Sequence, residues 1–474
     1  MNAAGPLWTG QDIIDAIGAR PTNGVAGDVT GVSIDTRTLE AGDVFFAIAG
    51  DNFDGHTFAS KAVAAGCSAL VVAEEKLPAL GHITKPLMVV PDVLQAMERL
   101  GVAARARTKA KIVAVTGSAG KTTTKEALRH VFAQQSSKVH ASPKSFNNHW
   151  GVPLTLARMP QDTEYAVFEI GMNHAGEITP LVKMVRPHVA MITLIAAAHL
   201  GNFKNMDGIA HAKAEIFRGV VRGGTALINR DDKRFKMLSQ LAGEAGVHRV
   251  AGYGKIKKSD VVLTDVDLRA DASTVSANVF GEKVTFEVPI AGRHVVHNLL
   301  GVLGAAHLLG ADVEKAAASF ASLQSVEGRG KLHTFKAETG PFTVIDESYN
   351  ANPASVAATL QILKTMEPGT NGRRIAILGD MLELGDHARK LHAGLADDVR
   401  EAELDRVILG GPEMKALAEA IGDGGPSVMH YDAADDVVTA AINLVHAGDV
   451  VLVKSSNGIG FSKVIKAFEK KYAV

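Results

Sequence analysis

The sequence AVTGSAGKTTTKEAL at residues 114–128 decides the fold of the central part of this chain. An apolar run leads into Gly117-Ser118-Ala119-Gly120, and Lys121-Thr122-Thr123 then opens a segment of helix-forming residues. Glycines allow successive backbone N–H groups to turn inward onto a phosphate, and the N-terminus of the following helix adds partial positive charge. The stretch therefore predicts a buried strand, a phosphate-binding turn and a helix, in that order.

Two side chains of this turn have a predicted role with a nucleotide. Lys121 can reach the β- and γ-phosphates, and the hydroxyl of Thr122 can hold Mg²⁺. The pattern G-x-x-x-x-G-K-[ST] is matched imperfectly, because Val115 stands in the place of its first glycine. The alternative is a glycine-rich turn with an unrelated lysine. The order of strand, turn, lysine and threonine favours the nucleotide site.

Outward from this stretch, short β-branched runs alternate with alanine-rich segments of helical character. Apolar strands that alternate with helices are typical of parallel sheets covered on both faces, which predicts an α/β fold. Residues 259–290 alternate polar and apolar side chains instead and predict an antiparallel hairpin or meander. The predicted strands are residues 68–73, 111–117, 165–171, 189–195, 225–229, 342–346, 374–380, 406–411 and 449–454.

The length of 474 residues suggests roughly three domains at about 150 residues each. The basic stretch 105–111 suits a linker that ends near residue 107, and a second break falls within 325–335. We therefore expect an N-terminal α/β domain at 1–107 and a central parallel-sheet, phosphate-loop ATPase domain at 108–328. A C-terminal Rossmann-like α/β domain would occupy 329–474.

The composition excludes several classes of protein. Fifty Lys and Arg against 51 Asp and Glu give a net charge of −1, without the basic excess typical of nucleic-acid binding. The best apolar run, residues 189–198, is shorter than the ~18 residues that a membrane span needs. The first residues resemble no secretory signal, and the single Cys67 cannot form an internal disulfide. We expect a cytoplasmic protein without membrane insertion.

Two further motifs are weaker. NRDD at 229–232 fits the N-x-x-D motif of a GTPase, but no D-x-x-G lies between residues 122 and 228, which argues against a GTPase. SNGIGFSK at 456–463 lacks the third glycine of a dinucleotide turn, and too little chain follows for a βαβ unit. It predicts an ordinary turn between a strand and a helix.

A second group of residues downstream of the phosphate turn suggests a metal site. Glu169 ends one predicted strand, His199 follows another, and Lys213 lies in the segment AHAKAEIF. Ligands of open α/β sheets bind where the carboxyl ends of neighbouring strands converge, so Glu169 and His199 could reach a Mg²⁺ beside the nucleotide. Taken singly, a strand-end Glu or His is more often a surface residue, and Lys213 would be a solvated lysine.

The motifs together resemble the ATP-dependent Mur ligases of peptidoglycan synthesis. The resemblance runs in order along nearly the whole chain, and several strings match the family's last ligation step in particular. The strings are TGSAGKTTTKE, NNHWGVPLTL (147–156), EIGMNHAGEI (169–178), AAAHLGNF (196–203), KAEIF (213–217), residues 33–58, DESYNANPASV (346–356) and LGDMLELG (378–385).

The resemblance implies roles for individual residues. Thr122 and Glu169 would hold one Mg²⁺, and a second would be held by Glu169, His199 and a Lys213 that CO₂ has carbamylated. Oxygen ligands of this kind suit Mg²⁺, whereas a plain ammonium would repel it. Asn298, Arg329 and Asp346 match positions that contact adenine, phosphates and ribose of ATP. The uridine-nucleotide and muramoyl positions are matched by Ser33, Thr36, Arg37, His56, Asn147 and Asn148.

The activity that the resemblance implies is ligation of D-alanyl-D-alanine to UDP-N-acetylmuramoyl-tripeptide through an acyl phosphate, by a monomer. A sister ligase that adds another amino acid, and a non-catalytic nucleotide-binding module, remain the alternatives. The sequence departs from the family at Val295, where the usual motif is G-R-H-N. It departs again at residues 454–457, where Lys-Ser-Ser-Asn replaces K-G-S-R.

Overall fold

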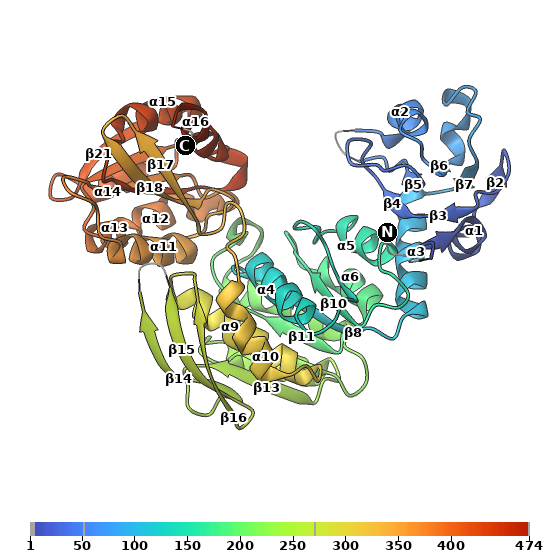
Figure 1. Ribbon diagram of the computed structural model, residues 1–474, viewed down its shortest axis with the longest axis horizontal. Helices are drawn as coiled ribbons and strands as arrows, with labels where there is room; N and C mark the ends of the chain where they lie inside the picture. Colours follow the sequence, from blue (N-terminus) through green and yellow to red (C-terminus); the bar gives the residue numbers. More distant parts are fainter. Residues whose placement is uncertain (1–4, 51–52, 270–271, 473–474) are drawn as a thin grey trace.

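The chain forms three α/β domains, each built on its own sheet (Figure 1). The computed structural model describes residues 5–50, 53–269 and 272–472. In Figure 1 the first domain (blue) and the third (orange to red) lie on either side above the central domain. The expected α/β architecture is confirmed. Residues 51–52 of the predicted uridine segment, 270–271 of the predicted meander and the first four residues of the chain lie outside the described residues.

The first domain has a five-stranded sheet in the order β2-β7-β6-β5-β4. Strands β4 to β7 are parallel, and of these only β6 was among the predicted strands. Strand β2, also missed by the sequence analysis, pairs with β7 in the antiparallel direction. A small pair, β1 and β3, lies beside the sheet. The elements are β1 (Trp8–Thr9), α1 (Gly10–Ile17), β2 (Arg20–Thr22), β3 (Asp28–Val29), β4 (Gly31–Ser33), β5 (Asp43–Phe46), η1 (Gly55–Phe58), α2 (Ala59–Ala64), β6 (Ala69–Ala73), η2 (Glu74–Ala79), β7 (Leu87–Val90) and α3 (Val93–Arg107).

The central domain has nine strands in the order β16-β15-β14-β13-β12-β11-β8-β10-β9. The chain leaves β8 toward β9 and β10 on one side and then crosses to β11 on the other, so the order reverses at β8. Ligands of open α/β sheets bind at such a reversal. The first elements are β8 (Lys111–Thr116), α4 (Lys121–Ala133), β9 (Val139–Ala141), α5 (Gly151–Ala157), β10 (Tyr165–Glu169), α6 (Ile178–Val185), β11 (Val189–Ile192), η3 (Leu200–Asn202) and α7 (Met206–Ala214).

Alternate residues of strand β8 pack on opposite faces of the central sheet, which explains its continuous apolar sequence. Val113 and Val115 face a core formed with helices α4, α9 and α10, whereas Ile112 and Ala114 face helices α5 to α8. Burial on both faces fixes the strand and thus the phosphate turn that follows it. The remaining elements are η4 (Glu215–Gly219), β12 (Thr225–Asn229), α8 (Phe235–Glu244), β13 (Arg249–Gly254), β14 (Val261–Leu268), β15 (Ser273–Val279), β16 (Glu282–Val288), α9 (Arg293–Leu308), α10 (Val313–Ser319) and η5 (Phe320–Ser322).

The predicted meander is present as strands β14, β15 and β16. Strand β14 pairs in parallel with β13 and antiparallel with β15, so the meander continues the central sheet rather than forming a separate one. Side chains of β15 alternate between buried and half-buried positions, in agreement with the polar and apolar alternation in the sequence.

The third domain has six strands in the order β17-β18-β22-β19-β20-β21. All neighbours are parallel except β17 and β18, and β17 is an edge strand that the sequence analysis missed. The elements are β17 (Lys331–Ala337), β18 (Gly340–Glu347), α11 (Pro353–Thr365), β19 (Arg374–Gly379), η6 (Gly385–His387), α12 (Ala388–Ala393), α13 (Ala396–Glu401), β20 (Arg406–Gly410), α14 (Lys415–Ile421), β21 (Ser427–Tyr431), α15 (Ala434–Leu444), β22 (Val450–Lys454), η7 (Asn457–Ile459) and α16 (Ser462–Lys471).

The predicted linker at 105–111 is wrong in its extent. Helix α3 continues to Arg107 and strand β8 begins at Lys111, which leaves residues 108–110 as the connection. Basic residues suit the last turn of a helix because its exposed carbonyls carry partial negative charge. Arg105 is buried, and its guanidinium donates to the carbonyls of Val185 and Arg186 in the central domain.

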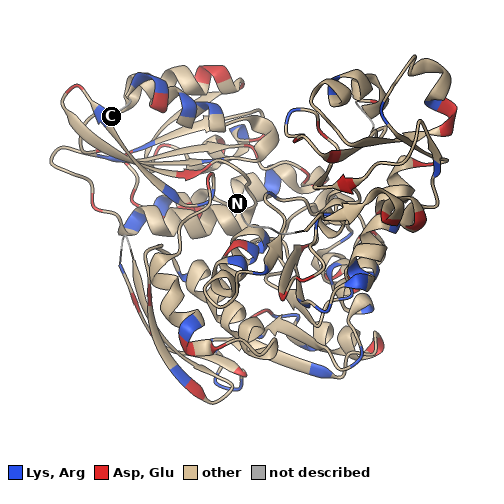
Figure 2. Cartoon of the chain, turned by 45° about the vertical axis from the view of Figure 1, so that its right-hand side comes forward, with Lys and Arg blue, Asp and Glu red and all other residues tan. Residues whose placement is uncertain are grey.

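Lys and Arg are interspersed with Asp and Glu over all three domains (Figure 2). This mixture agrees with the near-zero net charge. Among the described residues, no helix combines the length and the apolar composition that crossing a bilayer requires.

Candidate functional site

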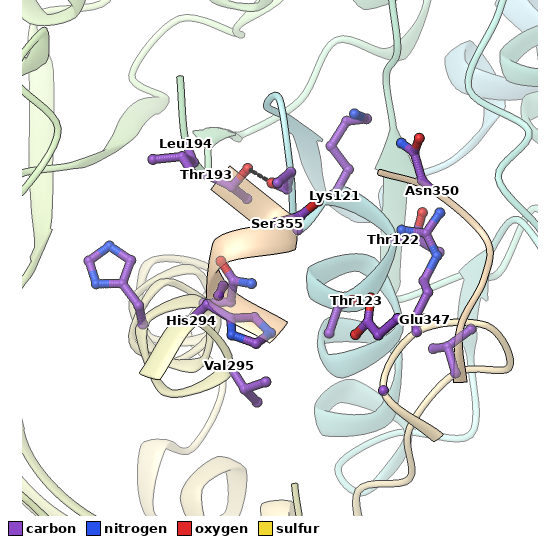
Figure 3. A pocket seen from close by; sticks show the side chains of 18 of the residues that line it. Lys121, Thr122, Thr123, Thr193, Leu194, His294, Val295, Glu347, Asn350 and Ser355 are labelled. Atoms are coloured by element: carbon purple, nitrogen blue, oxygen red, sulfur yellow. Dashed lines mark hydrogen bonds between the residues drawn. The ribbon is translucent and has the colours of Figure 1, made fainter. Parts of the chain in front are cut away.

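A cavity of about 950 Å³ lies between the central and third domains (Figure 3). The central domain contributes the start of helix α4 and the start of helix α9, which carry Lys121 and His294. The third domain contributes Glu347, Asn350 and Ser355. Two domains therefore share the walls of one site. Of the predicted nucleotide and metal residues, those that line the cavity are Ser118, Ala119, Gly120, Lys121, Thr122, Thr123, Glu169, His199, Asn298 and Arg329.

The two glycines of the phosphate turn are required by its shape. Gly117 and Gly120 have φ of +155° and +81°, in the region that other residues rarely adopt. A Cβ on Gly117 would collide with the hydroxyl of Thr193, and one on Gly120 would lie 2.7 Å from Nδ2 of Asn298. Gly117 shapes the turn without lining the cavity.

The loop after strand β11 holds the phosphate turn in place through two hydrogen bonds. The N–H of Ser118 donates to the carbonyl of Leu194 over 2.7 Å, and the hydroxyl of Thr193 donates to the carbonyl of Ala119 over 2.6 Å. These bonds fix the loop before any ligand arrives. They also occupy the N–H of Ser118, which leaves the amides nearer helix α4 for a phosphate.

Lys121 lies at the edge of the cavity and is half-buried rather than exposed. Its Nζ turns back to donate to the carbonyl of Gly117 over 2.7 Å. Burial lowers the pKa of Lys121, while the carboxylate of Glu169 raises it and the charge of Arg329 lowers it further. A phosphate bound at the turn would supply the negative charge that favours the ammonium form.

Thr122 and Glu169 meet at the mouth of the turn. The hydroxyl of Thr122 donates to Oε2 of Glu169 over 2.9 Å, and Nδ2 of Asn147 donates to Oε1 over 2.6 Å. Glu169 is buried at the end of strand β10, where its charge depends on such donors. The structure thus brings a hydroxyl and a carboxylate together, which is a donor set that Mg²⁺ prefers.

His199 lines the same cavity from the loop after strand β11. Its backbone is left-handed, with φ of +58°, and its ring Nδ1 contacts the carboxylate of Glu383 from the third domain. The contact with His199 lowers the pKa of Glu383. The sequence analysis missed Glu383, although the string LGDMLELG that contains it was among the matched motifs.

Lys213 does not line the cavity but is buried in helix α7. Burial lowers the pKa of Lys213 well below its ordinary value, and the charge of Lys121 lowers it further, so the two lysines lie within electrostatic reach. Within residues 5–50, 53–269 and 272–472, no three His, Cys, Asp or Glu side chains form a ready metal cluster. A metal here would therefore depend on Thr122 and Lys213 as well.

The NRDD motif has a structural role. Asn229 donates to the carbonyl of Thr193 over 2.9 Å, and Asp232 accepts from the N–H of Ile195 over 2.9 Å. The motif therefore holds the 193–195 loop that in turn holds the phosphate turn. This placement agrees with the earlier argument against a GTPase.

Asp346, predicted as the ribose ligand, does not line the cavity. Its carboxylate is buried and accepts from the N–H of Gly328 and from the N–H and hydroxyl of Ser348. Neighbours along a strand point to opposite faces, and it is Glu347 that reaches the cavity. Arg329 lies over the ring of Tyr349 with its Cζ 4.4 Å from the centroid.

Lys454 is a further residue of this site that the sequence analysis left without a role. It is buried at the end of strand β22 and donates to Oε2 of Glu347 over 3.0 Å and to the carbonyl of Asn350 over 2.9 Å. Glu347 and Lys454 are paired in register on adjacent strands β18 and β22. Their positions at the ends of two predicted strands could have suggested a role at the site. The sequence does not show, however, that the two strands are neighbours in the sheet.

The predicted uridine residues lie in the first domain, away from this cavity. Ser33 is buried and shares hydrogen bonds with the backbone of Asp35. Arg37 is exposed and pairs with the carboxylate of Asp35, and this hydrogen-bonded partner lowers the pKa of Asp35. Thr36 is half-buried between them. Ser33 ends strand β4, and Thr36 and Arg37 lie in the loop that follows it.

His56 and Asn148 are engaged in local structure. The His56 ring lies 2.6 Å from the Asp54 carboxylate at Nδ1, and its Nε2 accepts from the N–H of Ala73. Burial raises the pKa of Asp54, but hydrogen bonds from the backbone and ring of His56 outweigh it and leave a value of about 2. Asn148 accepts from the N–H of Gly151 at the start of helix α5, and only its neighbour Asn147 lines the cavity.

Three parts of the chain match the domains of one family. Residues 28–108 match the Mur ligase family catalytic domain, 115–306 the Mur ligase middle domain and 328–457 the Mur ligase glutamate ligase domain. The chain belongs to the Mur ligase family, whose members are ATP-dependent ligases that form peptide bonds.

The similar proteins point to one member of that family. The UDP-N-acetylmuramoyl-tripeptide–D-alanyl-D-alanine ligase of Rickettsia prowazekii is 30% identical over 463 residues, covering 98% of this chain and 100% of the relative. A crystal structure of MurF from Acinetobacter baumannii has a TM-score of 0.85 at 30% identity, covering 98% of this chain and 99% of that one. MurF from Thermotoga maritima in complex with ADP has a TM-score of 0.76 at 25% identity, covering 93% and 97%.

Proposed function

We propose that this chain joins D-alanyl-D-alanine to UDP-N-acetylmuramoyl-tripeptide in the cytoplasm, with ATP converted to ADP and phosphate. This step completes the UDP-linked precursor of peptidoglycan and thus serves cell-wall growth, cell shape and division. The observation that carries the proposal is the phosphate turn at a cavity shared by two domains, in a chain that matches ligases of that name over nearly its whole length.

The reaction requires an activated carboxylate, because a carboxylate and an amine do not condense in water. An oxygen of the tripeptide carboxylate attacks the γ-phosphorus, the bond to ADP breaks, and an acyl phosphate forms. The free amine of D-alanyl-D-alanine then attacks the acyl carbon, phosphate leaves, and the new amide nitrogen gives its proton to solvent. Such phosphoryl transfer depends mainly on positioning and on charge stabilisation.

Different residues of the cavity would bind different parts of ATP. The amides at the start of helix α4 and the ammonium of Lys121 bind the phosphates, and Arg329 adds a second positive charge from the third domain. Gly120 and Asn298 shape the floor beside the adenine position. Glu347, rather than Asp346, is the acidic residue within reach of a ribose in this arrangement.

The donor set fits Mg²⁺. Thr122 and Glu169 would hold one ion, and Glu169, His199 and carbamylated Lys213 a second; bound there, Mg²⁺ would neutralise charge on the phosphates. Carbamylation is supported by the lowered pKa of Lys213, because only the unprotonated amine attacks CO₂. The nitrogen forms a bond to carbon, one proton is released, and the product is an anionic oxygen ligand.

The other substrates are assigned by domain. The loop at Ser33–Arg37 would hold the uridine nucleotide, and Asn147 would lie near the muramoyl end. The third domain would close over ATP and the incoming dipeptide, as multi-domain enzymes do to exclude water. We also propose that a single chain is active as a monomer, with domain limits at 107 and 328.

One assay of ADP release tests the proposal. Purified protein is given ATP and Mg²⁺ with UDP-N-acetylmuramoyl-tripeptide, with D-alanyl-D-alanine, with both, and with neither. We expect ADP and the pentapeptide product only when both acceptors are present. A fifth mixture contains a shorter UDP-muramoyl peptide and a different amino acid, and ADP release in that mixture alone would identify a sister ligase. No release in any mixture would indicate a non-catalytic module.

A further inference from the structure

Two loops from different domains are in backbone contact beside the cavity. The loop at residues 199–203 belongs to the central domain, and the loop at 380–387 belongs to the third. The N–H of Gly201 donates to the carbonyl of Glu383 over 3.0 Å. A Cβ on Gly385 would lie 2.7 Å from the Cα of Gly201, so no larger residue fits there without movement. The two backbones therefore meet closely only because both positions are glycine.

The residues that flank this contact have unusual backbones. His199 and Glu383 have φ of +58° and +65°, a left-handed conformation that non-glycine residues adopt only at an energetic cost. Such conformations persist where the surroundings determine them and are frequent at functional sites. Here the two left-handed residues face each other across the domain boundary, with Nδ1 of His199 on the carboxylate of Glu383.

A chance surface ion pair between His199 and Glu383 would not explain the geometry of the two loops. The Glu383 side chain is about half exposed, and an isolated exposed ion pair contributes little to stability. That contribution alone would not hold two residues in left-handed conformations. The glycine contact, the backbone hydrogen bond and the imidazole–carboxylate contact converge on one point, which indicates that the loops are shaped for each other.

We propose that Glu383 is a positioning residue for His199 and that it couples docking of the third domain to the metal site. The carboxylate accepts the Nδ1 proton of His199, which fixes the tautomer and leaves Nε2 as the nitrogen free to bind a metal. Carboxylates that hold a metal-binding histidine in this way also raise its basicity. The inference rests on the proposed function, because that function supplies the need for a metal at His199.

The coupling has a thermodynamic consequence. If docking of the third domain improves the metal site, then bound metal must favour docking by the same factor. The metal-binding loop would be complete only when the third domain is in place. Phosphoryl transfer would therefore be restricted to the closed arrangement, in which water is excluded from the acyl phosphate.

Binding of Mn²⁺ to the ADP-bound full-length protein, followed by electron paramagnetic resonance, tests the proposal without turnover. Glu383→Ala should weaken Mn²⁺ binding about 10- to 100-fold, which is the usual effect of removing such a carboxylate. Asp386→Ala is the matched control, because Asp386 is an exposed carboxylate of the same loop. Unchanged binding in Glu383→Ala, or an equal loss in Asp386→Ala, would overturn the proposal.

A second variant tests the coupling with the carboxylate left in place. Gly385→Ala puts a methyl group against Gly201 and should separate the loops, so it should weaken Mn²⁺ binding as Glu383→Ala does. Full Mn²⁺ affinity in Gly385→Ala would show that docking and metal binding are independent and would refute the coupling.

The tautomer gives a third readout. Long-range ¹H–¹⁵N spectra of ¹⁵N-histidine-labelled protein, with the signal assigned by His199→Gln, should show the proton on Nδ1 in the wild type. A mixture of tautomers is expected in Glu383→Ala, and a proton fixed on Nε2 in the wild type would overturn the proposal. Ligation of D-alanyl-D-alanine by the wild type, measured in parallel, tests the proposed function separately. If the wild type showed the expected histidine signals but no ligation, only the proposed function would be rejected.

Discussion

The hydroxyl of Thr122 donates a 2.9 Å hydrogen bond to the carboxylate of Glu169, and this bond joins the start of helix α4 to the end of strand β10. The two residues are 47 positions apart in the chain. They meet because β8 and β10 are adjacent parallel strands whose carboxyl ends open on the same edge of the sheet. The position of the site is thus a consequence of strand order.

Lys121→Ala should leave a folded protein that no longer ligates. The side chain lies at the cavity edge and, among the described residues, donates to the carbonyl of Gly117 alone, so its removal opens no core. Loss of one preorganised charge on the phosphates should lower kcat by about 100- to 1,000-fold. Turnover is measured by ADP release and folding by thermal unfolding, with the exposed Lys204→Ala as control. Near-wild-type turnover in Lys121→Ala would reject its assignment.

Lys213→Ala should abolish ligation, and added bicarbonate should not restore it. The variant lacks the amine that CO₂ would modify, and thus the anionic oxygen ligand. Short carboxylic acids such as acetate should restore part of the activity by occupying the vacated space. ¹³C-bicarbonate should give a carbamate resonance in the wild type that is missing from the variant. A variant that turns over at the wild-type rate without additives would mean that Lys213 has no role in the reaction.

Stability should depend on pH through Lys213 in CO₂-free buffer. Burial depresses its pKa in the folded protein, whereas the unfolded chain holds this proton up to a pH near 10.5. Between the lowered pKa of the folded state and 10.5, unfolding therefore takes up a proton, so the free energy of unfolding rises with pH in that window. Between about pH 7 and pH 9, urea unfolding should show the wild type gaining stability relative to Lys213→Met. A difference that stays flat or falls with pH would contradict this.

Asp346→Asn should mainly lower the stability of the protein, whereas Glu347→Gln should mainly weaken its use of ATP. Asp346 is buried and accepts three hydrogen bonds from Gly328 and Ser348, so Asp346→Asn should lower the free energy of unfolding by about 2 kcal/mol. Glu347 faces the cavity, and Glu347→Gln should raise KM for ATP with a smaller change in stability. Urea unfolding and initial rates separate the two. A raised KM for ATP in Asp346→Asn, together with a loss of stability in Glu347→Gln, would instead support Asp346 as the ribose ligand.

Arg37→Ala should raise KM for the UDP-tripeptide and leave KM for ATP and D-alanyl-D-alanine within a few-fold. The guanidinium is exposed and held by Asp35, so its loss removes binding that substrate and transition state share. Stability should hardly change, because exposed pairs contribute little. Arg20→Ala, which removes another exposed pair of the same domain, is the control. A selective rise in KM for ATP would move the uridine site elsewhere.

Continuous apolar strands and the phosphate turn were predictable because their residues carry the signal themselves. Strands β2 and β17 were not, since these edge strands bury few side chains and leave little pattern. The buried strands β5 and β7 were missed because each has only four residues. The finding that Glu347 lines the cavity while Asp346 does not has a different cause. Both are carboxylates in one motif, and only the direction of each side chain along β18 distinguishes them.

Contacts between elements distant in sequence lay beyond the sequence analysis. Lys454 lies beside Glu347 because β18 and β22 are neighbours, and His199 meets Glu383 because two domains dock. Neither residue pair has a sequence separation that predicts a contact. His56 was selected by resemblance, and the structure adds that both its ring nitrogens are engaged within its own domain.

The burial of Cys67 makes this protein convenient for distance measurements. It is the only cysteine, it is fully enclosed in the first domain, and burial raises the pKa of its thiol, so labelling reagents should not reach it. Cysteines introduced at the exposed Lys204 and Lys390 would therefore carry spin labels without background. The separation of the central and third domains could then be followed directly as each substrate is added.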